Sequence, residues 1–188
     1  YFIANSKYIA RRIRKVYDRD AAVIYPPVDT KKFSLCKEKE DYYVIAARFV
    51  PYKRVDLIVE AFTAMPDKKL LVIGDGPEEK KIRNLAGGNI RFAGYLPQDE
   101  LISKIGNAKA FLFAAEEDFG ITIVEAQACG TPVIAFGRGG ASETVIEGVS
   151  GVLFAEQTPA SVIEAVNKFE KSGGTFDYEK IRKHAESF

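Results

Sequence analysis

The sequence is poor in the residues that build disulfide frameworks and zinc sites. It contains two cysteines, Cys36 and Cys129, and one histidine, His184, among 188 residues. The cysteines are far apart in the sequence and form no CxxC pair, so with a single histidine they supply no soft ligand set for zinc. We therefore predict no metal site of this kind. Low cysteine content also favours a reducing compartment, and a cytoplasmic protein is expected.

An excess of charge of one sign and long apolar runs are also lacking. The chain carries 27 lysines and arginines against 26 aspartates and glutamates, a net charge of +1. Nucleic-acid-binding proteins usually show a broad positive excess, so nucleic acid is not expected as a partner and any anion must be bound locally. No apolar run reaches the roughly 18 residues of a membrane span, and no signal peptide is recognised. With 47% hydrophobic and 28% charged residues, the composition predicts one sizeable globular core.

An amphipathic helix is predicted directly after Ser6, a residue type preferred at helix N-caps. Its apolar and basic residues recur at helical spacing on opposite faces: Ile9, Ile13, Val16 and Tyr17 against Lys7, Arg11, Arg14 and Lys15. The basic face could touch anionic lipid, but a solvated face is the favoured interpretation. Because the sequence begins at Tyr1 without methionine, we expect a piece of a longer chain, which residues 1–17 enter as a helix.

Seven short apolar runs predict β-strands that alternate with segments of helical period. The strands are predicted at 22–25, 43–47, 70–73, 90–92, 110–113, 132–136 and 152–154, and the helices at 55–65, 77–85, 98–105, 121–129, 141–146 and 159–170. The apolar runs are continuous, as expected for strands covered on both faces. A spacing of about twenty residues suits βα units, so the fold class predicted is α/β, a doubly wound, Rossmann-like parallel sheet in a single domain over 1–188.

The ends of the predicted domain are less regular. A last helix is predicted at 178–187, after a turn at Ser172, Gly173 and Gly174, and residues 176–188 form the terminal segment. Residues 34–41, rich in lysine and glutamate, are the expected exposed loop. No second domain boundary is recognised.

Residues suited to anion binding follow several predicted strands, where parallel sheets bind their ligands. Arg48 and Lys53 follow one strand, and Gly120 opens the predicted helix 121–129. Arginine and lysine supply positive charge to an anion, while a glycine at a helix N-terminus lets backbone N–H groups approach phosphate. Arg48 and Lys53 taken alone would be read as a surface pair near a turn.

Glu125 is the residue hardest to explain by structure alone. It is the only charge in the apolar helix 121–129, and an ionised carboxylate there needs hydrogen-bonding partners. Paired hydroxyls of a ligand would provide them, and Glu117 precedes it so that both carboxylates can face one cleft. The alternative is that Glu125 caps a backbone amide or meets an arginine.

Two further patterns point to chemistry that we reject. The loop 74–79 lacks the third glycine of a dinucleotide fingerprint and follows an internal strand, so NAD is not the expected cofactor. Asp18 and Asp20 have the acid spacing of some metal-dependent transferases, but a turn and a strand start explain them.

The combined motifs resemble the C-terminal, donor-binding domain of retaining glycosyltransferases with the two-Rossmann-domain (GT-B) architecture, the family numbered 4. The resemblance covers nearly the whole chain, in the family's order and spacing. It runs through NSKYIARRI, YPPVDTKKF, ARFVPYKRVDLIVEAF, VIGDGP, FAGYLPQDEL, EEDFGITIVEAQACGTPVIAFGRGGASETV and GVLF. The most specific element is Glu117, seven intervening residues and Glu125. The subfamily most similar is that of mannosyltransferases that use GDP-mannose.

The resemblance implies roles for individual residues. Arg48 and Lys53 match the pair that holds the donor diphosphate, and Glu117 matches the carboxylate on the sugar hydroxyls; these three are the catalytic candidates. Glu125 matches the carboxylate on the ribose hydroxyls. The other implied donor-binding residues lie in strand-end loops: Gly74, Gly94, Tyr95, Leu96, Phe119, Gly120, Ile121 and Thr122.

The activity implied is transfer of a hexosyl group, with mannosyl from GDP-mannose favoured, to an acceptor alcohol with retention and without a metal or other cofactor. Family members have a second, N-terminal Rossmann domain that holds the acceptor, a glycan or lipid-linked molecule; here we expect it to be absent and the fragment to be inactive. The resemblance leaves peripheral membrane contact of the full-length protein open. A sugar-nucleotide 2-epimerase and a non-catalytic sugar-nucleotide-binding module are the alternatives.

Overall fold

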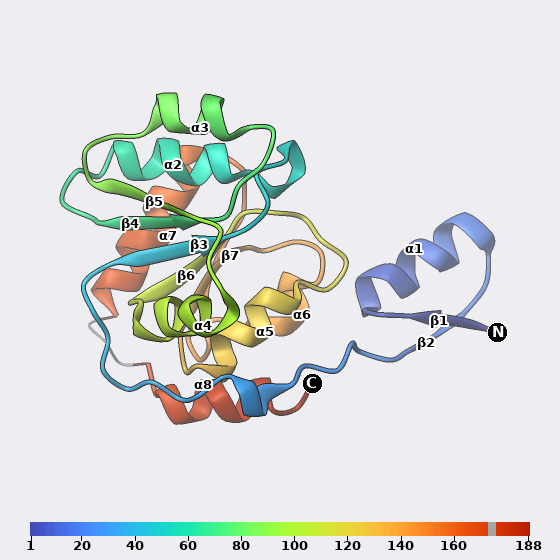
Figure 1. The fold of residues 1–188 in the computed structure, drawn as a ribbon. Coiled ribbons are helices and arrows are strands. Elements are labelled where there is room, and N and C mark those ends of the chain that lie inside the picture. The colour runs from blue at the N-terminus through green and yellow to red at the C-terminus, as the bar shows by residue number, and fades with distance from the viewer. Residues whose placement is uncertain (173–175) are drawn as a thin grey trace.

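The computed structural model describes residues 1–172 and 176–188, which include a six-stranded parallel sheet (Figure 1). Its strands are β3 (Tyr43–Ala46), β4 (Leu70–Ile73), β5 (Ile90–Gly94), β6 (Ala110–Phe113), β7 (Val133–Phe136) and β8 (Gly151–Phe154). They lie in the order β5-β4-β3-β6-β7-β8, and every neighbouring pair is parallel. The predicted doubly wound α/β fold is confirmed.

Helices cover both faces of this sheet. One face is covered by α2 (Val55–Thr63), α3 (Glu79–Leu85) and α7 (Pro159–Lys171), and the other by α4 (Gln98–Asn107), α5 (Ile121–Ala128) and α6 (Ala141–Thr144), with α8 (Tyr178–Ala185) packed against α5. Along β3, Tyr43 and Ile45 belong to the first apolar cluster and Val44 to the second. Both faces of the strand are buried, which explains why the predicted strands read as continuous apolar runs.

The first 23 residues form a separate two-stranded parallel sheet with a helix beside it (Figure 1). It consists of β1 (Phe2–Ala4), α1 (Lys7–Tyr17) and β2 (Ala21–Val23). The helix after Ser6 is confirmed, and the Ser6 side chain accepts a hydrogen bond from the Ile9 amide. The strand predicted at 22–25 is found as β2, one residue earlier, and it pairs with β1 rather than with the main sheet.

The segments between and after these units are held by side-chain contacts. Residues 34–41 contain no regular structure, as predicted, but Lys39 turns inward and donates to Gly106 O at 2.6 Å and to Thr131 Oγ1 at 2.9 Å. Burial lowers the pKa of Lys39 to about 8. Arg182 anchors α8 by donating to Ala128 O at 2.7 Å. Of the predicted turn at 172–174, Gly173 and Gly174 lie outside the described residues.

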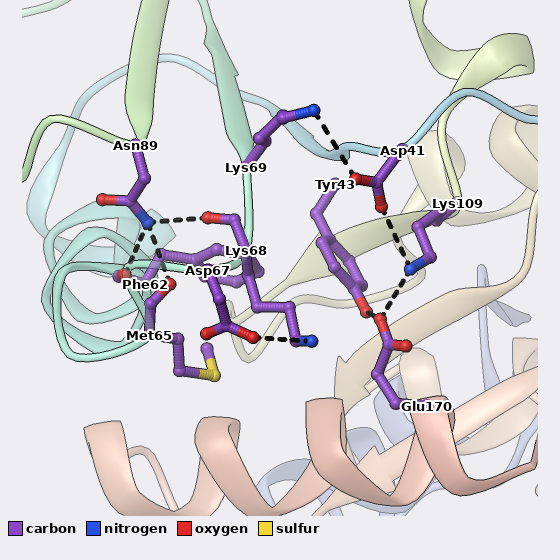
Figure 2. Close-up of polar contacts among 10 residues, drawn as sticks. All are labelled: Asp41, Tyr43, Phe62, Met65, Asp67, Lys68, Lys69, Asn89, Lys109 and Glu170. Atoms are coloured by element: carbon purple, nitrogen blue, oxygen red, sulfur yellow. Dashed lines mark hydrogen bonds and ion pairs between the residues drawn. The ribbon is translucent and has the colours of Figure 1, made fainter.

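The amino-terminal edge of the main sheet is closed by paired polar groups (Figure 2). Glu170 accepts from the Tyr43 hydroxyl and, at 2.8 Å, from Lys109, which also pairs with Asp41 at 3.3 Å. Burial and Glu170 raise the pKa of the Tyr43 hydroxyl. Asn89 donates to three carbonyl groups at the end of α2 and before β4. These contacts stabilise the edge opposite to the one at which parallel sheets bind ligands.

Candidate functional site

The strand order reverses between β3 and β6. The chain leaves β3 toward β4 and β5 on one side, then returns to β6 and continues to β7 and β8 on the other. Ligands of open α/β sheets bind at such a switch point, beyond the carboxyl ends of the two strands. Lys53, in the short 3₁₀ turn η2 (Pro51–Lys53) after β3, and Glu117, in the loop after β6, meet there.

Lys53 and Glu117 form an ion pair in this structure. The Lys53 ammonium donates to Glu117 Oε1, and the two side chains are only 21% and 20% exposed. An incoming phosphate would compete with Glu117 for the ammonium, and a sugar hydroxyl would compete with Lys53 for the carboxylate. A ligand that carries both a phosphate and a sugar can therefore replace the ion pair with two contacts, one to Lys53 and one to Glu117.

A cavity of about 460 Å³ opens beside this ion pair. Six predicted site residues line it: Lys53, Glu117, Phe119, Gly120, Ile121 and Thr122. The other lining residues were not predicted from the sequence; they are Asn5, Pro26, Tyr52, Glu116 and Asp118. The cavity thus combines the two sides of the switch point with residues from the first 26 of the chain.

Gly120 begins α5 at the wall of this cavity. Its φ of +81° lies in the left-handed region, which glycine adopts without the strain that a Cβ would add. The turn at Gly120 directs the N-terminus of α5 to the cavity, where unpaired backbone N–H groups and the helix dipole favour an anion. Binding of phosphate at Gly120 stays a prediction, and the backbone at Gly120 has the conformation that such a loop uses.

The loop after β7 supports the loop that carries Glu117. Gly140 N donates to Glu117 O at 2.8 Å. A Cβ on Gly139 would lie 2.3 Å from Glu117 O, and one on Gly140 would lie 2.2 Å from the Cα of Phe119. The two loops therefore approach so closely that only glycine fits between them.

We expect the substitution Gly139→Ala to destabilise the protein more than Gly148→Ala. Both glycines have positive φ, +66° and +75°, so both alanine variants carry backbone strain. A Cβ at Gly148 meets nothing within 4 Å, whereas one at Gly139 overlaps Glu117. The additional overlap should lower the free energy of unfolding by about 1 to 3 kcal/mol, measured by urea denaturation. Equal losses in the two variants would contradict the close packing of these loops.

Glu125 lies in the second turn of α5, partly buried. Burial raises the pKa of its carboxyl group. Among the residues that the structure describes, its side chain has neither a hydrogen bond nor an ion pair, so the alternative of a backbone cap or an arginine partner is not found. No described group offsets the cost of desolvating this carboxylate. Glu125 is not among the residues that line the cavity beside Glu117, so the structure does not bring the two carboxylates to one cavity wall.

The remaining predicted residues lie at the carboxyl ends of β3, β4 and β5, outside the wall of this cavity. Arg48 is exposed, Tyr95 is 80% exposed, and Leu96 packs against the second apolar cluster. Gly74 N donates to Gly94 O at 2.8 Å, which brings these two loops together. The predicted site residues thus share one edge of the sheet, but only Lys53 of the predicted diphosphate-binding pair lines the cavity, while Arg48 and the predicted base-binding loop lie outside its wall.

Asn5 lines the cavity although no motif or periodicity in the sequence points to it. It directly precedes the N-cap Ser6, and its Oδ1 is buried without a hydrogen-bond partner among the described residues. A buried amide oxygen without a partner costs about 1 to 3 kcal/mol. Asn5 is identified as a candidate site residue only by the three-dimensional arrangement, which places it in the same cavity wall as Glu117.

Two further features concern metals and membranes. In residues 1–172 and 176–188, no group of three or more His, Cys, Asp or Glu side chains is placed to hold a metal ion. No helix in the same part of the chain has both the length and the apolar character to span a bilayer.

The fold is a Rossmann-like α/β unit. Its candidate ligand site lies at the carboxyl ends of the strands, where the strand order reverses. Residues 28–188 match the family of glycosyl transferases group 1, and the chain belongs to this family. A GDP-mannose-dependent mannosyltransferase of monoacylated phosphatidylinositol monomannoside from Corynebacterium glutamicum is 34% identical over 171 residues, covering 74% of this chain and 45% of the relative. A glycosyltransferase from Methanocaldococcus jannaschii without further characterisation is 32% identical, covering 89% and 50%.

Solved structures show the same fold. Sucrose-phosphate synthase from Thermosynechococcus elongatus superposes with a TM-score of 0.85 at 22% identity, over 98% of this chain and 53% of that protein. HepE from Anabaena, solved in complex with UDP and glucose, has a TM-score of 0.77 at 22% identity, over 97% and 55%. The family match confirms the resemblance to this family of glycosyltransferases, and the solved structures show the same Rossmann-like fold. The chain spans about half the length of the curated relatives that it matches.

Proposed function

We propose that this chain binds a nucleotide-sugar donor and takes part in transfer of the hexosyl group, mannosyl from GDP-mannose, to an acceptor alcohol with retention. The observation that carries the proposal is the meeting of Lys53 and Glu117 at the switch point, beside the N-terminus of α5. One group suits the diphosphate and the other suits sugar hydroxyls. The mannosyltransferase relative supports the choice of sugar and nucleotide.

In the proposed reaction the bond between the anomeric carbon and the diphosphate breaks, and a bond from the acceptor oxygen forms on the same face. The acceptor proton passes to the departing phosphate. Lys53, Arg48 and the N-terminus of α5 stabilise the negative charge that develops on this leaving group. Glu117 orients the hexose, Glu125 binds the ribose hydroxyls, and the loop 94–96 contacts the base.

We expect donor binding to be independent of divalent metal. The positive groups that would balance the diphosphate are protein groups, Arg48, Lys53 and the end of α5. Calorimetric titration of GDP-mannose into the chain in EDTA should therefore give the same dissociation constant as titration with Mg²⁺ or Mn²⁺ present. Loss of binding in EDTA that either metal restores would refute this part of the proposal.

We also propose that transfer needs parts of the protein beyond this chain, with a glycan or lipid-linked acceptor bound there and the encoded protein working in the cytoplasm. The cavity at the switch point is open on one side, and closure that excludes water typically comes from a facing element. Labelled GDP-mannose incubated with the chain should give no glycoside, whereas the complete gene product should give one. Efficient transfer by the chain alone would contradict this expectation. A labelled 2-epimeric sugar nucleotide formed without acceptor would instead indicate an epimerase.

A further inference from the structure

The first turn of α1 is completed by a carboxylate from a distant part of the chain. Backbone N–H groups in the first turn of a helix lack partners within the helix. The N-cap Ser6 accepts from one of them, Ile9 N, through its side chain. Glu143, on α6, accepts from two more: Oε2 from Lys7 N at 2.9 Å and Oε1 from Tyr8 N at 2.7 Å. Both carboxylate oxygens are thus used at the positive end of the helix dipole.

Beyond β1 and β2, few other contacts join α1 to the rest of the described chain. None of its residues is fully buried, and its apolar contacts lie with these two strands, as in the stacking of Tyr17 on Phe2. The Tyr8 hydroxyl donates to Glu116 at 2.8 Å, and Arg12 lies 3.8 Å from Asp118 in an exposed ion pair of the kind that contributes little. Glu143 Oε2 also accepts from the Tyr25 hydroxyl at 3.1 Å, which secures the chain as it leaves β2.

The cavity of about 460 Å³ at the switch point is called the donor cavity below. Two residues that contact α1, Glu116 and Asp118, line this cavity. Glu143 lies three residues after Gly140, whose backbone is in contact with Phe119 and hydrogen-bonded to Glu117. Asn5 and Pro26 stand just before α1 and just after Tyr25, and both line the cavity. Hydrogen bonds therefore link the loop of Glu117, through α6, to the segment that contributes Asn5 and Pro26 to the cavity wall.

We propose that Glu143 is a positioning residue that holds Asn5 against the sugar end of the donor cavity. This inference rests on the proposed function. The Asn5 Oδ1 is buried and accepts no hydrogen bond from any described residue, so the amide gains by turning this oxygen toward a hydroxyl that enters the cavity. Asn5 lines the same cavity as Lys53 and Glu117. In the proposed function Glu117 orients the hexose, so Asn5 affects binding of the hexose rather than of the nucleoside.

The test compares Glu143→Gln with Asn5→Ala and with Glu164→Gln, an exposed position on α7 that serves as the matched control. Glutamine offers one acceptor oxygen where the carboxylate offers two, so it cannot serve both amides. Amide hydrogen exchange of Lys7 and Tyr8 in the free protein should accelerate about tenfold or more in Glu143→Gln and stay unchanged in the other two variants.

Affinity for GDP and for GDP-mannose is then measured by calorimetry on the same proteins. The preference for GDP-mannose should fall about fivefold or more in both Glu143→Gln and Asn5→Ala, while the affinity for GDP stays within twofold. A change in stability alone would leave this ratio unchanged, and Asn5→Ala keeps the Glu143 contact should the first variant fold poorly. Unchanged exchange, or an unchanged ratio, in Glu143→Gln overturns the inference. Absence of nucleotide-sugar binding by the unsubstituted chain would instead refute the proposed function.

Discussion

Replacing Lys53 by methionine is expected to weaken GDP binding by about 10- to 150-fold. A hydrogen bond to a charged group contributes about 1.5 to 3 kcal/mol, and Lys53 is the partly buried cation at the switch point. Methionine keeps the length of the side chain and removes the charge. In the complete gene product, transfer should fall by a further factor of about 10² to 10³, because the same charge would stabilise the leaving diphosphate.

Two controls separate this role from a general effect of charge or folding. Lys171→Met removes an exposed positive charge at the end of α7 and should leave GDP affinity unchanged. The double variant Lys53→Met/Glu117→Gln removes the carboxylate that would otherwise lose its partner, and it should show the same loss as Lys53→Met alone. If Lys53→Met weakens binding no more than Lys171→Met does, the diphosphate is not bound at the switch point.

Replacing Glu125 by alanine is expected to weaken binding of free GDP by about 1 to 3 kcal/mol, whereas Glu117→Ala should remove the preference for GDP-mannose and largely spare free GDP. Glu125 is partly buried and unpartnered among the described residues, as a ribose-binding carboxylate would be before the ligand arrives. Glu164→Ala, at an exposed position, is the control. Equal losses of GDP affinity in Glu117→Ala and Glu125→Ala, with circular dichroism unchanged, would show that these two assignments are wrong.

The pH dependence of binding follows from the same carboxyl group. Burial raises the pKa of Glu125 in the free protein, and hydroxyl donors in the complex favour the ionised form and lower that pKa. Affinity for GDP should therefore be highest above the raised pKa and should fall as the pH decreases through it. Calorimetry on Glu125→Gln, which cannot ionise, should show a smaller slope over this interval. The same slope in both proteins would contradict this origin.

Strand positions could be predicted from the sequence because burial on both faces leaves continuous apolar runs. The run at 70–73 coincides with β4, and the run at 43–47 ends one residue beyond β3. The extension of β5 to Gly94 could not be predicted, because it depends on the hydrogen bond from Gly74 N to Gly94 O. Similarly, α3 begins at Glu79 rather than at residue 77, since the preceding turn is held by a bond from Glu78 N to Phe49 O.

The site was predictable to the extent that it consists of strand-end residues. Lys53, Glu117 and Gly120 lie within seven residues of the ends of β3 and β6, and the switch-point rule then brings them together. Glu143 was not predictable, because its partners Lys7 and Tyr8 are more than a hundred residues away and no local periodicity records such contacts. Asn5 was not predictable because it shares the cavity wall with residues 116–122, which are equally distant in the sequence. The strand β1 has only three residues, too few for a recognisable pattern.

Hydrogen exchange of the chain with and without saturating GDP-mannose shows where the donor binds. We expect slower exchange in the loops at 48–53 and 94–96 and across 116–125, all at the carboxyl ends of the strands. A second, larger cavity of about 850 Å³ lies at the opposite edge and includes Tyr42, Lys69 and Asn89 among its lining residues. Protection confined to that edge, or no protection at 116–125, would contradict the proposal that this chain binds its donor at the switch point.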